Sequence, residues 1–387
     1  MKSIVIVNNN MKVGGVQKSL YNLLWSIRGQ YDVTLCLFDR HGAYLDQLPP
    51  EVKIVTCRGL VRYLALGQGE CKGIHKLLRG ALALGCRMLG RNRIIKLILR
   101  FTKPMPGAYD HAIAFLHNGN LRSLYGGVQE FTLSHVRAGQ KVAFLHCDYG
   151  SCGANNPYNN RLLTRFDRIA ACSDGCRRAF ERIMPEMKEK CVTVPNFHRY
   201  EEIRSFAAEK ASFQQDALHL ISVARLTHEK GIERGIQAVA KAVEAGFDVM
   251  LHIVGGGGME PKLKALTGEL KLEDRVIFHG QQENPYPYMA GADLFLLTSY
   301  HEAAPMVIDE AVCLGLPVLT VRTTSSDEMV TKRGAGWVCD NDQQALDQAL
   351  LDVLAQKDLL ETVKVSLRER TVDNSSAAQQ LRILIEG

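Results

Sequence analysis

The sequence predicts an α/β protein with two domains, each a parallel sheet covered by helices on both faces. Three observations support this fold class. The chain has 387 residues, which is about the length of two domains. Short runs rich in Val, Ile and Leu alternate with helical patterns along both halves. Glycines at 14–15 and 255–258 follow two of these runs, as they do in strand-to-helix turns.

The first domain is expected over residues 1–197. Its first strand, 4–7, leads through Gly14 and Gly15 into a helix at about 16–27. Its later strands are expected at 33–38, 52–56, 111–116, 142–145, 168–172 and 191–194. Pro195 ends this series, because proline cannot continue a ladder of backbone hydrogen bonds.

The second domain is expected over residues 198–370. Its strands are expected at 218–224, 249–254, 276–279, 294–298, 317–321 and 336–338. Helices are expected at 231–245, from about Pro261, and at 305–314. A helical tail ends in a segment, 371–387, that we expect to be able to cross back to the first domain.

The composition excludes several classes of protein. Hydrophobic residues make up 46% and charged residues 23%, which is typical of a globular enzyme. The sequence has no apolar run of the roughly 18 residues that span a bilayer, and its first apolar run is too short for a signal peptide. We therefore expect a cytoplasmic protein. The 11 cysteines show no metal-binding spacing, including the pairs Cys147/Cys152 and Cys172/Cys176, and are interpreted as reduced core thiols.

Positive charge is concentrated at 58–103. This segment contains eleven Lys and Arg residues and one acidic residue, Glu70. Apolar residues recur there at helical spacing, and basic residues form a second stripe. That stripe consists of Lys72, Lys76, Arg79 and Arg87. Such a basic amphipathic helix can lie on an anionic membrane surface or meet a lipid-linked substrate. A solvated surface helix and a basic cleft remain alternatives, whereas no motif supports nucleic-acid binding.

The charged residues most indicative of a binding or catalytic site lie in the second half of the chain. Arg225 and Lys230 share one strand-to-helix loop, where two cations suit a diphosphate, although a solvated pair is the alternative. Glu302 precedes an expected helix, and Glu310 lies inside it as either a ligand contact or a core acid. The glycines at 255–258 do not complete Gly-x-Gly-x-x-Gly, which disfavours a dinucleotide site.

These residues belong to longer motifs. The motifs are Val13–Val16, Ser222–Gly231, Val254–Gly258, the segment from Gly280 to Met289, and Ser299–Pro317. Over nearly its whole length the chain resembles the family 4 retaining glycosyltransferases (glycosyl transferases group 1). The Asn-Pro-Tyr-Pro-Tyr run at 284–288 and residues 141–148 are similar to members that build bacterial capsular and cell-surface polysaccharides.

The resemblance implies the GT-B fold, in which two Rossmann-like βαβ domains face each other across a cleft. It assigns Gly14 and Gly15 to a loop near the donor phosphates. Arg225 and Lys230 would neutralise the diphosphate, Glu302 would bind donor-sugar hydroxyls and Glu310 the ribose hydroxyls. His146 matches the histidine that faces the donor sugar, and His117 is a weaker candidate for that role.

The chain departs from the family at three places. Ala303 and Ala304 follow Glu302 where glycine and a larger apolar residue are usual, Asp309 replaces an apolar residue, and Gln17 replaces an acid. The first departure bears on the choice of donor sugar. The Asp-x-Asp sequence at 340–342 is interpreted as a turn or helix cap rather than as a metal site.

The resemblance therefore implies a retaining, metal-independent glycosyltransferase without a cofactor. It would transfer sugar from a nucleotide-sugar, expected to be a UDP-sugar, to a glycan or lipid-linked acceptor of capsule or lipopolysaccharide synthesis. We expect it on the inner face of the plasma membrane. A sugar-nucleotide epimerase and a non-catalytic nucleotide-sugar-binding relative are the alternatives.

Overall fold

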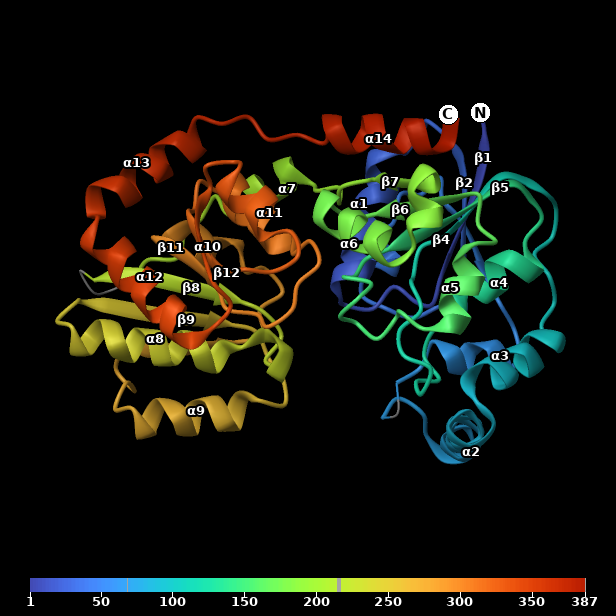
Figure 1. The fold of residues 1–387 in the computed structure, drawn as a ribbon, viewed down its shortest axis with the longest axis horizontal. Helices are drawn as coiled ribbons and strands as arrows, with labels where there is room; N and C mark the ends of the chain where they lie inside the picture. The colour runs from blue at the N-terminus through green and yellow to red at the C-terminus, as the bar shows by residue number, and fades with distance from the viewer. Residues whose placement is uncertain (68, 214–216, 387) are drawn as a thin grey trace. The chain divides into compact units, whose positions relative to one another are not determined.

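The computed structural model describes residues 1–67, 69–213 and 217–386, which form two compact units (Figure 1). Unit 1 comprises Met1–Phe197 together with the chain from Asn374 onward. Unit 2 is His198–Asp373, so it ends three residues beyond the boundary expected from the sequence. Each unit is built around a single parallel sheet among the described residues.

The seven strands of unit 1 lie in the order β3-β2-β1-β4-β5-β6-β7. They are β1 (Ser3–Asn8), β2 (Asp32–Leu37), β3 (Lys53–Thr56), β4 (Tyr109–Ala114), β5 (Ala138–Leu145), β6 (Arg168–Ala171) and β7 (Cys191–Thr193). The strand order reverses direction between β1 and β4. Helices α1 (Gly15–Ser26), α4 (Val128–His135), α5 (Pro157–Leu163) and α6 (Asp174–Ile183) connect the strands.

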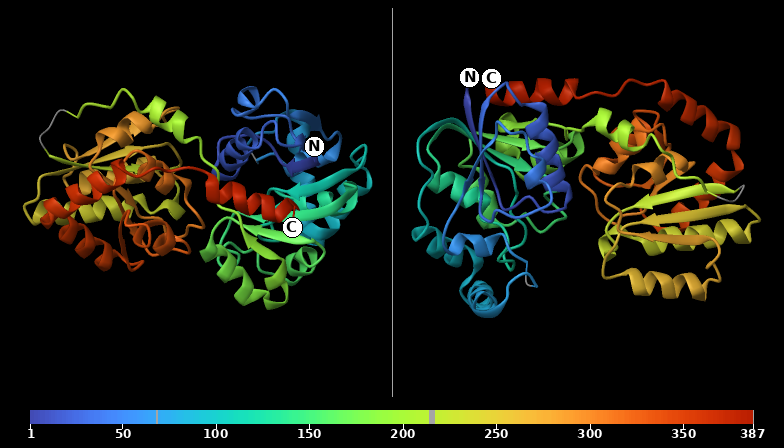
Figure 2. Two further views of the ribbon diagram at one scale, coloured as in Figure 1. Left: turned by 90° about the horizontal axis from the view of Figure 1, so that it is seen from above. Right: turned by 180° about the vertical axis from the view of Figure 1, so that it is seen from behind.

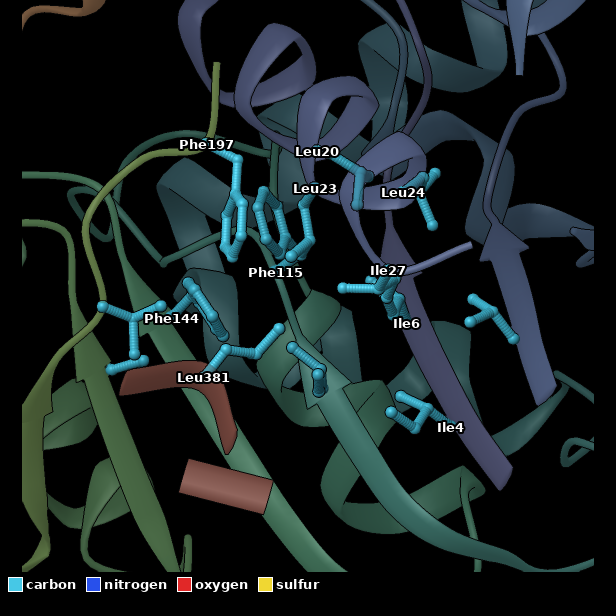
Figure 3. Close-up of a cluster of buried hydrophobic side chains, with 14 of the residues drawn as sticks. Ile4, Ile6, Leu20, Leu23, Leu24, Ile27, Phe115, Phe144, Phe197 and Leu381 are labelled. Carbon is cyan, nitrogen blue, oxygen red and sulfur yellow. The ribbon is translucent and has the colours of Figure 1, made fainter. Parts of the chain in front are cut away.

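The C-terminal helix α14 (Ser375–Glu386) completes the core of unit 1. Its Leu381 reaches a buried cluster that includes Phe115, Phe144 and Phe197 (Figure 3). Lys2 Nζ also donates to the carbonyl of Ile385 at 3.2 Å. The N-terminus therefore lies close to the end of α14, as the N and C labels in Figure 2 show.

The six strands of unit 2 lie in the order β10-β9-β8-β11-β12-β13, with the reversal between β8 and β11. They are β8 (Leu218–Val223), β9 (Val249–Val254), β10 (Val276–Gly280), β11 (Leu294–Leu297), β12 (Val318–Val321) and β13 (Gly336–Cys339). The helices are α7 (Tyr200–Phe206), α8 (Ile232–Glu244), α9 (Glu260–Glu269), α10 (Tyr286–Gly291), α11 (Met306–Cys313), α12 (Gln343–Ala355) and α13 (Lys357–Arg368).

The basic segment forms two helices, α2 (Gly73–Leu89) and α3 (Arg91–Arg100). They are separated by Gly90, whose φ of 88° suits glycine. Arg91 does not contribute to the surface charge, because it is fully buried and pairs with Glu130 Oε1 at 3.1 Å and Asn118 Oδ1 at 2.9 Å. Among the described residues, no helix is both long and apolar enough to cross a membrane.

Three histidines on neighbouring strands of unit 2 form a hydrogen-bonded row. His219 Nδ1 lies 3.0 Å from His252 Nε2, and His252 Nδ1 lies 2.9 Å from His279 Nε2. Burial, together with the two neighbouring imidazoles, lowers the pKa of His252 to about 3. The fold therefore holds this imidazole neutral at every pH at which enzymes normally work.

This row makes a pH dependence of stability testable. The unfolded chain takes up a proton on His252 below its ordinary pKa of 6.5, whereas the folded chain does so only near 3. Stability is therefore complete above about pH 6.5 and is lost as the pH falls toward 3. We expect His252→Gln to reduce the loss of unfolding free energy between pH 6.5 and 5 by at most about 2 kcal/mol. Urea unfolding at each pH measures this loss. Exposed His301→Gln is the control, and an equal pH slope in both variants would contradict the assignment.

Candidate active site

The candidate site of unit 2 lies where β8 and β11 are neighbours and the strand order reverses. In doubly wound sheets the loops at such a point leave a crevice beyond the carboxyl ends of the strands. Here the loop after β8 runs from Ala224 to Gly231, and the loop after β11 runs from Thr298 to Pro305. These two loops contain three of the predicted site residues, Arg225, Lys230 and Glu302.

Lys230 and Glu302 meet at this point. Lys230 Nζ lies 2.6 Å from Glu302 Oε1, and Ser299 Oγ donates to the same oxygen at 2.8 Å. The two side chains are 21% and 11% exposed, so the ion pair is partly shielded from water. The structure thus brings together a cation and an acid that lie 72 residues apart in the chain.

Direct contacts between the two loops hold this ion pair in place. Thr298 Oγ1 donates to the carbonyl of Gly231 at 2.7 Å, and the Tyr300 N–H donates to the carbonyl of Glu229 at 3.0 Å. Gly231 has a φ of 58°, and a Cβ there would lie 2.4 Å from the Thr298 carbonyl oxygen. Both the conformation and the close approach therefore require glycine.

Arg225 stands apart from the Lys230–Glu302 pair. Its side chain is 67% exposed, and its guanidinium lies 3.7 Å from Glu229. The glycines after β9 support its loop, because the Leu226 N–H donates to the Gly256 carbonyl at 2.9 Å. A Cβ at Gly255 would lie 1.8 Å from the Ala224 carbonyl oxygen, so this backbone contact needs glycine.

Glu310 lies in α11, the helix that follows the Glu302 loop, and is 4% exposed. Its neighbour Asp309, one of the departures from the family pattern, is in an ion-pair cluster of its own. Burial would raise the pKa of Asp309, but the His198 ring at 3.2 Å and Arg333 at 2.5 Å lower it to about 2. The charge of Asp309 is thus satisfied within unit 2.

Arg234 is a buried residue of this region that the sequence reasoning missed. Its Nη1 donates to Asn341 Oδ1 at 2.7 Å and to the Thr298 carbonyl at 3.3 Å, and its guanidinium lies 4.9 Å from the centre of the Tyr300 ring. The bond to Asn341 links the Asp-x-Asp sequence to the loops of the site. Asp342 caps α12 by accepting from the Ala345 N–H at 2.8 Å, which confirms the predicted helix cap.

Unit 1 places its glycine pair at the start of a helix. Gly14 immediately precedes α1, and Gly15 is its first residue. A Cβ at Gly14 would lie 2.7 Å from Gln17 Oε1, whereas a Cβ at Gly15 would meet nothing within 4 Å. Gln17, another departure from the family pattern, is therefore directly beside the glycine loop.

His146 follows β5, and His117 follows the neighbouring strand β4. The His146 ring lies 4.5 Å from the Phe115 ring centre and 5.6 Å from that of Phe144. Burial lowers the pKa of His146 to about 3, assisted by His117, and burial lowers the pKa of His117 to about 4. Both imidazoles are therefore neutral near pH 7, and each can form hydrogen bonds without carrying charge.

Residues 204–374 match the family described as Glycosyl transferases group 1. This range covers nearly all of unit 2, including Arg225, Lys230, Glu302 and Glu310. Unit 2 belongs to the group 1 glycosyltransferases.

Curated relatives of this glycosyltransferase domain include proteins named for bacterial polysaccharide synthesis. The putative colanic acid biosynthesis glycosyltransferase WcaL of Escherichia coli is 34% identical over 162 residues, which are 40% of this chain and 40% of WcaL. The amylovoran biosynthesis glycosyltransferase AmsK of Erwinia amylovora is 35% identical over 150 residues, 35% of this chain and 37% of AmsK. The chain thus spans about two fifths of the length of these relatives.

Solved glycosyltransferase structures resemble the whole chain. The structure of WaaG, a glycosyltransferase involved in lipopolysaccharide biosynthesis, has a TM-score of 0.65 at 17% identity, covering 99% of this chain and 100% of WaaG. HepE of Anabaena, solved in complex with UDP, has a TM-score of 0.67 at 19% identity, covering 99% of each chain. The predicted GT-B fold with two Rossmann-like domains is confirmed.

The close contact between Gly231 and the Thr298 carbonyl in this glycosyltransferase domain can be tested by mutation. Gly231→Ala should lower the free energy of unfolding of unit 2 by about 1–3 kcal/mol, because the new Cβ meets the Thr298 carbonyl in a conformation that side chains disfavour. Thermal and urea unfolding measure the change. Gly258→Ala is the matched control, since a Cβ there meets nothing within 4 Å. Equal stability of the two variants would contradict the tight contact.

Proposed function

We propose that the chain is a retaining glycosyltransferase that moves a sugar from a nucleotide-sugar to a glycan or lipid-linked acceptor of surface polysaccharide synthesis. The observation that carries this proposal is the Lys230–Glu302 pair at the point where the strand order of unit 2 reverses. The names of WcaL and AmsK supply the class of product. The UDP bound by HepE supports a UDP-sugar as the donor.

Lys230 and Arg225 carry the charge that this reaction needs. An ammonium has three N–H donors, and the bond to Glu302 uses one of them, so Lys230 can bind an anion while the pair persists. Arg225 brings an exposed fork of donors from the same loop. As the bond between sugar and diphosphate breaks, both cations stabilise the negative charge that develops on the leaving group. We therefore propose a transfer step without a metal ion, in which these two cations supply the positive charge.

The remaining residues bind and orient the donor. Glu302, fixed by Lys230 and Ser299, accepts hydrogen bonds from sugar hydroxyls, and Glu310 does so from the ribose. For unit 1, the resemblance to the family assigns Gly14 and Gly15 to the donor phosphates and His146 to the donor sugar. A neutral His146 would hydrogen-bond a sugar hydroxyl rather than act as an acid. Front-face substitution assisted by the leaving phosphate accounts for retention without a protein nucleophile.

This assignment predicts which substitutions abolish transfer. Lys230→Ala and Arg225→Ala should each lower kcat/KM by about 100- to 1,000-fold, because each removes a cation that faces the leaving group. Transfer of labelled sugar from a UDP-sugar to an acceptor glycan measures the loss. Lys241→Ala, which removes an exposed cation of α8 paired with Glu244, should leave transfer unchanged.

Measurement of UDP binding distinguishes a nucleotide-binding role of Glu310 from a structural role in the core. Glu310→Gln should raise the dissociation constant for UDP with little change in thermal stability. Wild-type transfer in both cation variants would refute the diphosphate site. If Glu310→Gln unfolds the protein while UDP affinity is kept, the glutamate is a core acid.

We also propose that unit 1 binds the anionic surface of the membrane through α2. This helix projects from the edge of unit 1, beyond α3 (Figure 2). Its inner side is fixed by a 2.6 Å bond between His75 and Tyr63, a 2.9 Å bond from Arg79 to the Leu66 carbonyl, and buried Cys86. Its exposed apolar side chains, each 43% to 74% exposed, are Ile74, Leu77, Leu78, Leu84, Met88 and Leu89.

This apolar side of α2 faces outward beside three exposed basic residues, Lys72, Lys76 and Arg87. Leu97 and Phe101, 50% and 71% exposed, extend the apolar surface at α3. An outward apolar side flanked by cations suits the boundary between acidic headgroups and acyl chains. A lipid-linked acceptor would meet the enzyme at that surface.

Vesicle sedimentation tests this contact. The protein should sediment with vesicles that contain anionic lipid, and salt should release it. Changing Lys72, Lys76 and Arg87 to Glu should weaken binding by more than about 100-fold, since each cation contributes about 1 kcal/mol. The control changes three exposed cations of unit 2, Lys241, Lys262 and Lys264, to Glu.

Two results would contradict the membrane contact. One is equal sedimentation with neutral and anionic vesicles. The other is loss of UDP affinity in the α2 variant, which would place the helix at the catalytic site.

A further inference from the structure

His117, Cys147 and Cys152 gather in unit 1 near the carboxyl ends of β4 and β5. An imidazole nitrogen of His117 and the two Sγ atoms all lie within 4.8 Å of one another. The two cysteines alone match no metal motif in the sequence. The third potential ligand, His117, lies in the loop after β4, and the pairing of β4 with β5 brings this loop beside the cysteines.

The turn after β5 brings Cys152 back toward Cys147. The Cys152 N–H donates to the Asp148 carbonyl at 3.1 Å, and the Gly150 N–H donates to Asp148 Oδ1 at 2.9 Å. Cys147 is buried, whereas Cys152 is exposed, which corrects the expectation that it is a core thiol. The cluster therefore has an inner sulfur and an outer sulfur that solvent can reach.

The imidazole of this cluster also has an unused ligand atom. The buried Nδ1 of His117 has no hydrogen-bond partner among the described residues. Cysteine binds a metal ion as its thiolate, so binding would release the protons of both thiols.

We propose that His117, Cys147 and Cys152 form a binding site for one soft divalent cation of the Zn²⁺ type. Two thiolates and an imidazole are ligands that zinc prefers, and three protein ligands leave a fourth tetrahedral position for water or an external ligand. The cation closes the turn at 147–152 and fixes the backbone next to His146. The site lies outside the diphosphate-binding residues of unit 2, and its test does not depend on transfer activity.

Cobalt substitution of the full-length protein tests the site. The reduced, metal-free protein is titrated with Co²⁺, and absorption is recorded in the near ultraviolet and visible. We expect one equivalent to give thiolate-to-cobalt charge transfer and the visible bands of tetrahedral Co²⁺, and one equivalent of Zn²⁺ to remove both. His117→Gln, Cys147→Ser and Cys152→Ser should each weaken binding by more than the roughly 10- to 100-fold that loss of an outer partner costs.

The matched control is Cys57→Ser, because Cys57 lies 3.4 Å from Cys36 in a two-sulfur cluster of the same unit. This variant should bind Co²⁺ as the wild type does. Circular dichroism checks that each variant is folded, and exposed Cys152→Ser carries the test if the buried variants unfold. Absence of charge transfer in the wild type, unchanged binding in folded Cys152→Ser, or loss of binding in Cys57→Ser would overturn the proposal.

Discussion

The contact between the loops after β8 and β11 is the constraint on which the proposed chemistry of unit 2 depends. Thr298 holds the carbonyl of Gly231, and only glycine allows the backbones to approach so closely. This contact places Lys230 at a fixed distance from Glu302 and sets the start of α8 beside both. A cation on a flexible loop would lose conformational entropy each time it bound an anion, and this loss would weaken binding. Here most of that entropy is already lost when the domain folds.

The candidate residues of the two units lie in different electrostatic environments. In unit 2, Lys230 and Glu302 are partly buried, and each is the other's partner in an ion pair. In unit 1, His146 has aromatic neighbours rather than a carboxylate, and the lower free energy belongs to its neutral form. The candidate residues of unit 2 therefore form an ion pair, whereas the candidate histidines of unit 1 are neutral hydrogen-bonding groups. His117 shares this neutral state, which also suits it to bind a metal ion.

Features that depend on residues close together in the sequence could be predicted from it. The strand and helix series, the glycine turns, the Arg225–Lys230 loop and the Asp342 cap all depend on residues close together in the chain. The partners of Arg234 could not be predicted, because Asn341 reaches it only through tertiary packing. The cluster of His117 with Cys147 and Cys152 depends in the same way on strand pairing. For α2, helical periodicity identified an apolar side, but only the bonds of His75 and Arg79 show that this side faces outward.

The place of α14 in the core of unit 1 has a consequence for how the protein is made. Unit 2 is a continuous stretch of chain, so it can fold as soon as it has left the ribosome. Unit 1 begins first, yet Leu381, Leu384 and Ile385 of its core are synthesised after all of unit 2. Until then the apolar surface that α14 covers is exposed to water. The domain that is started first is therefore finished last, and chaperones would find their binding surface on unit 1 rather than on unit 2.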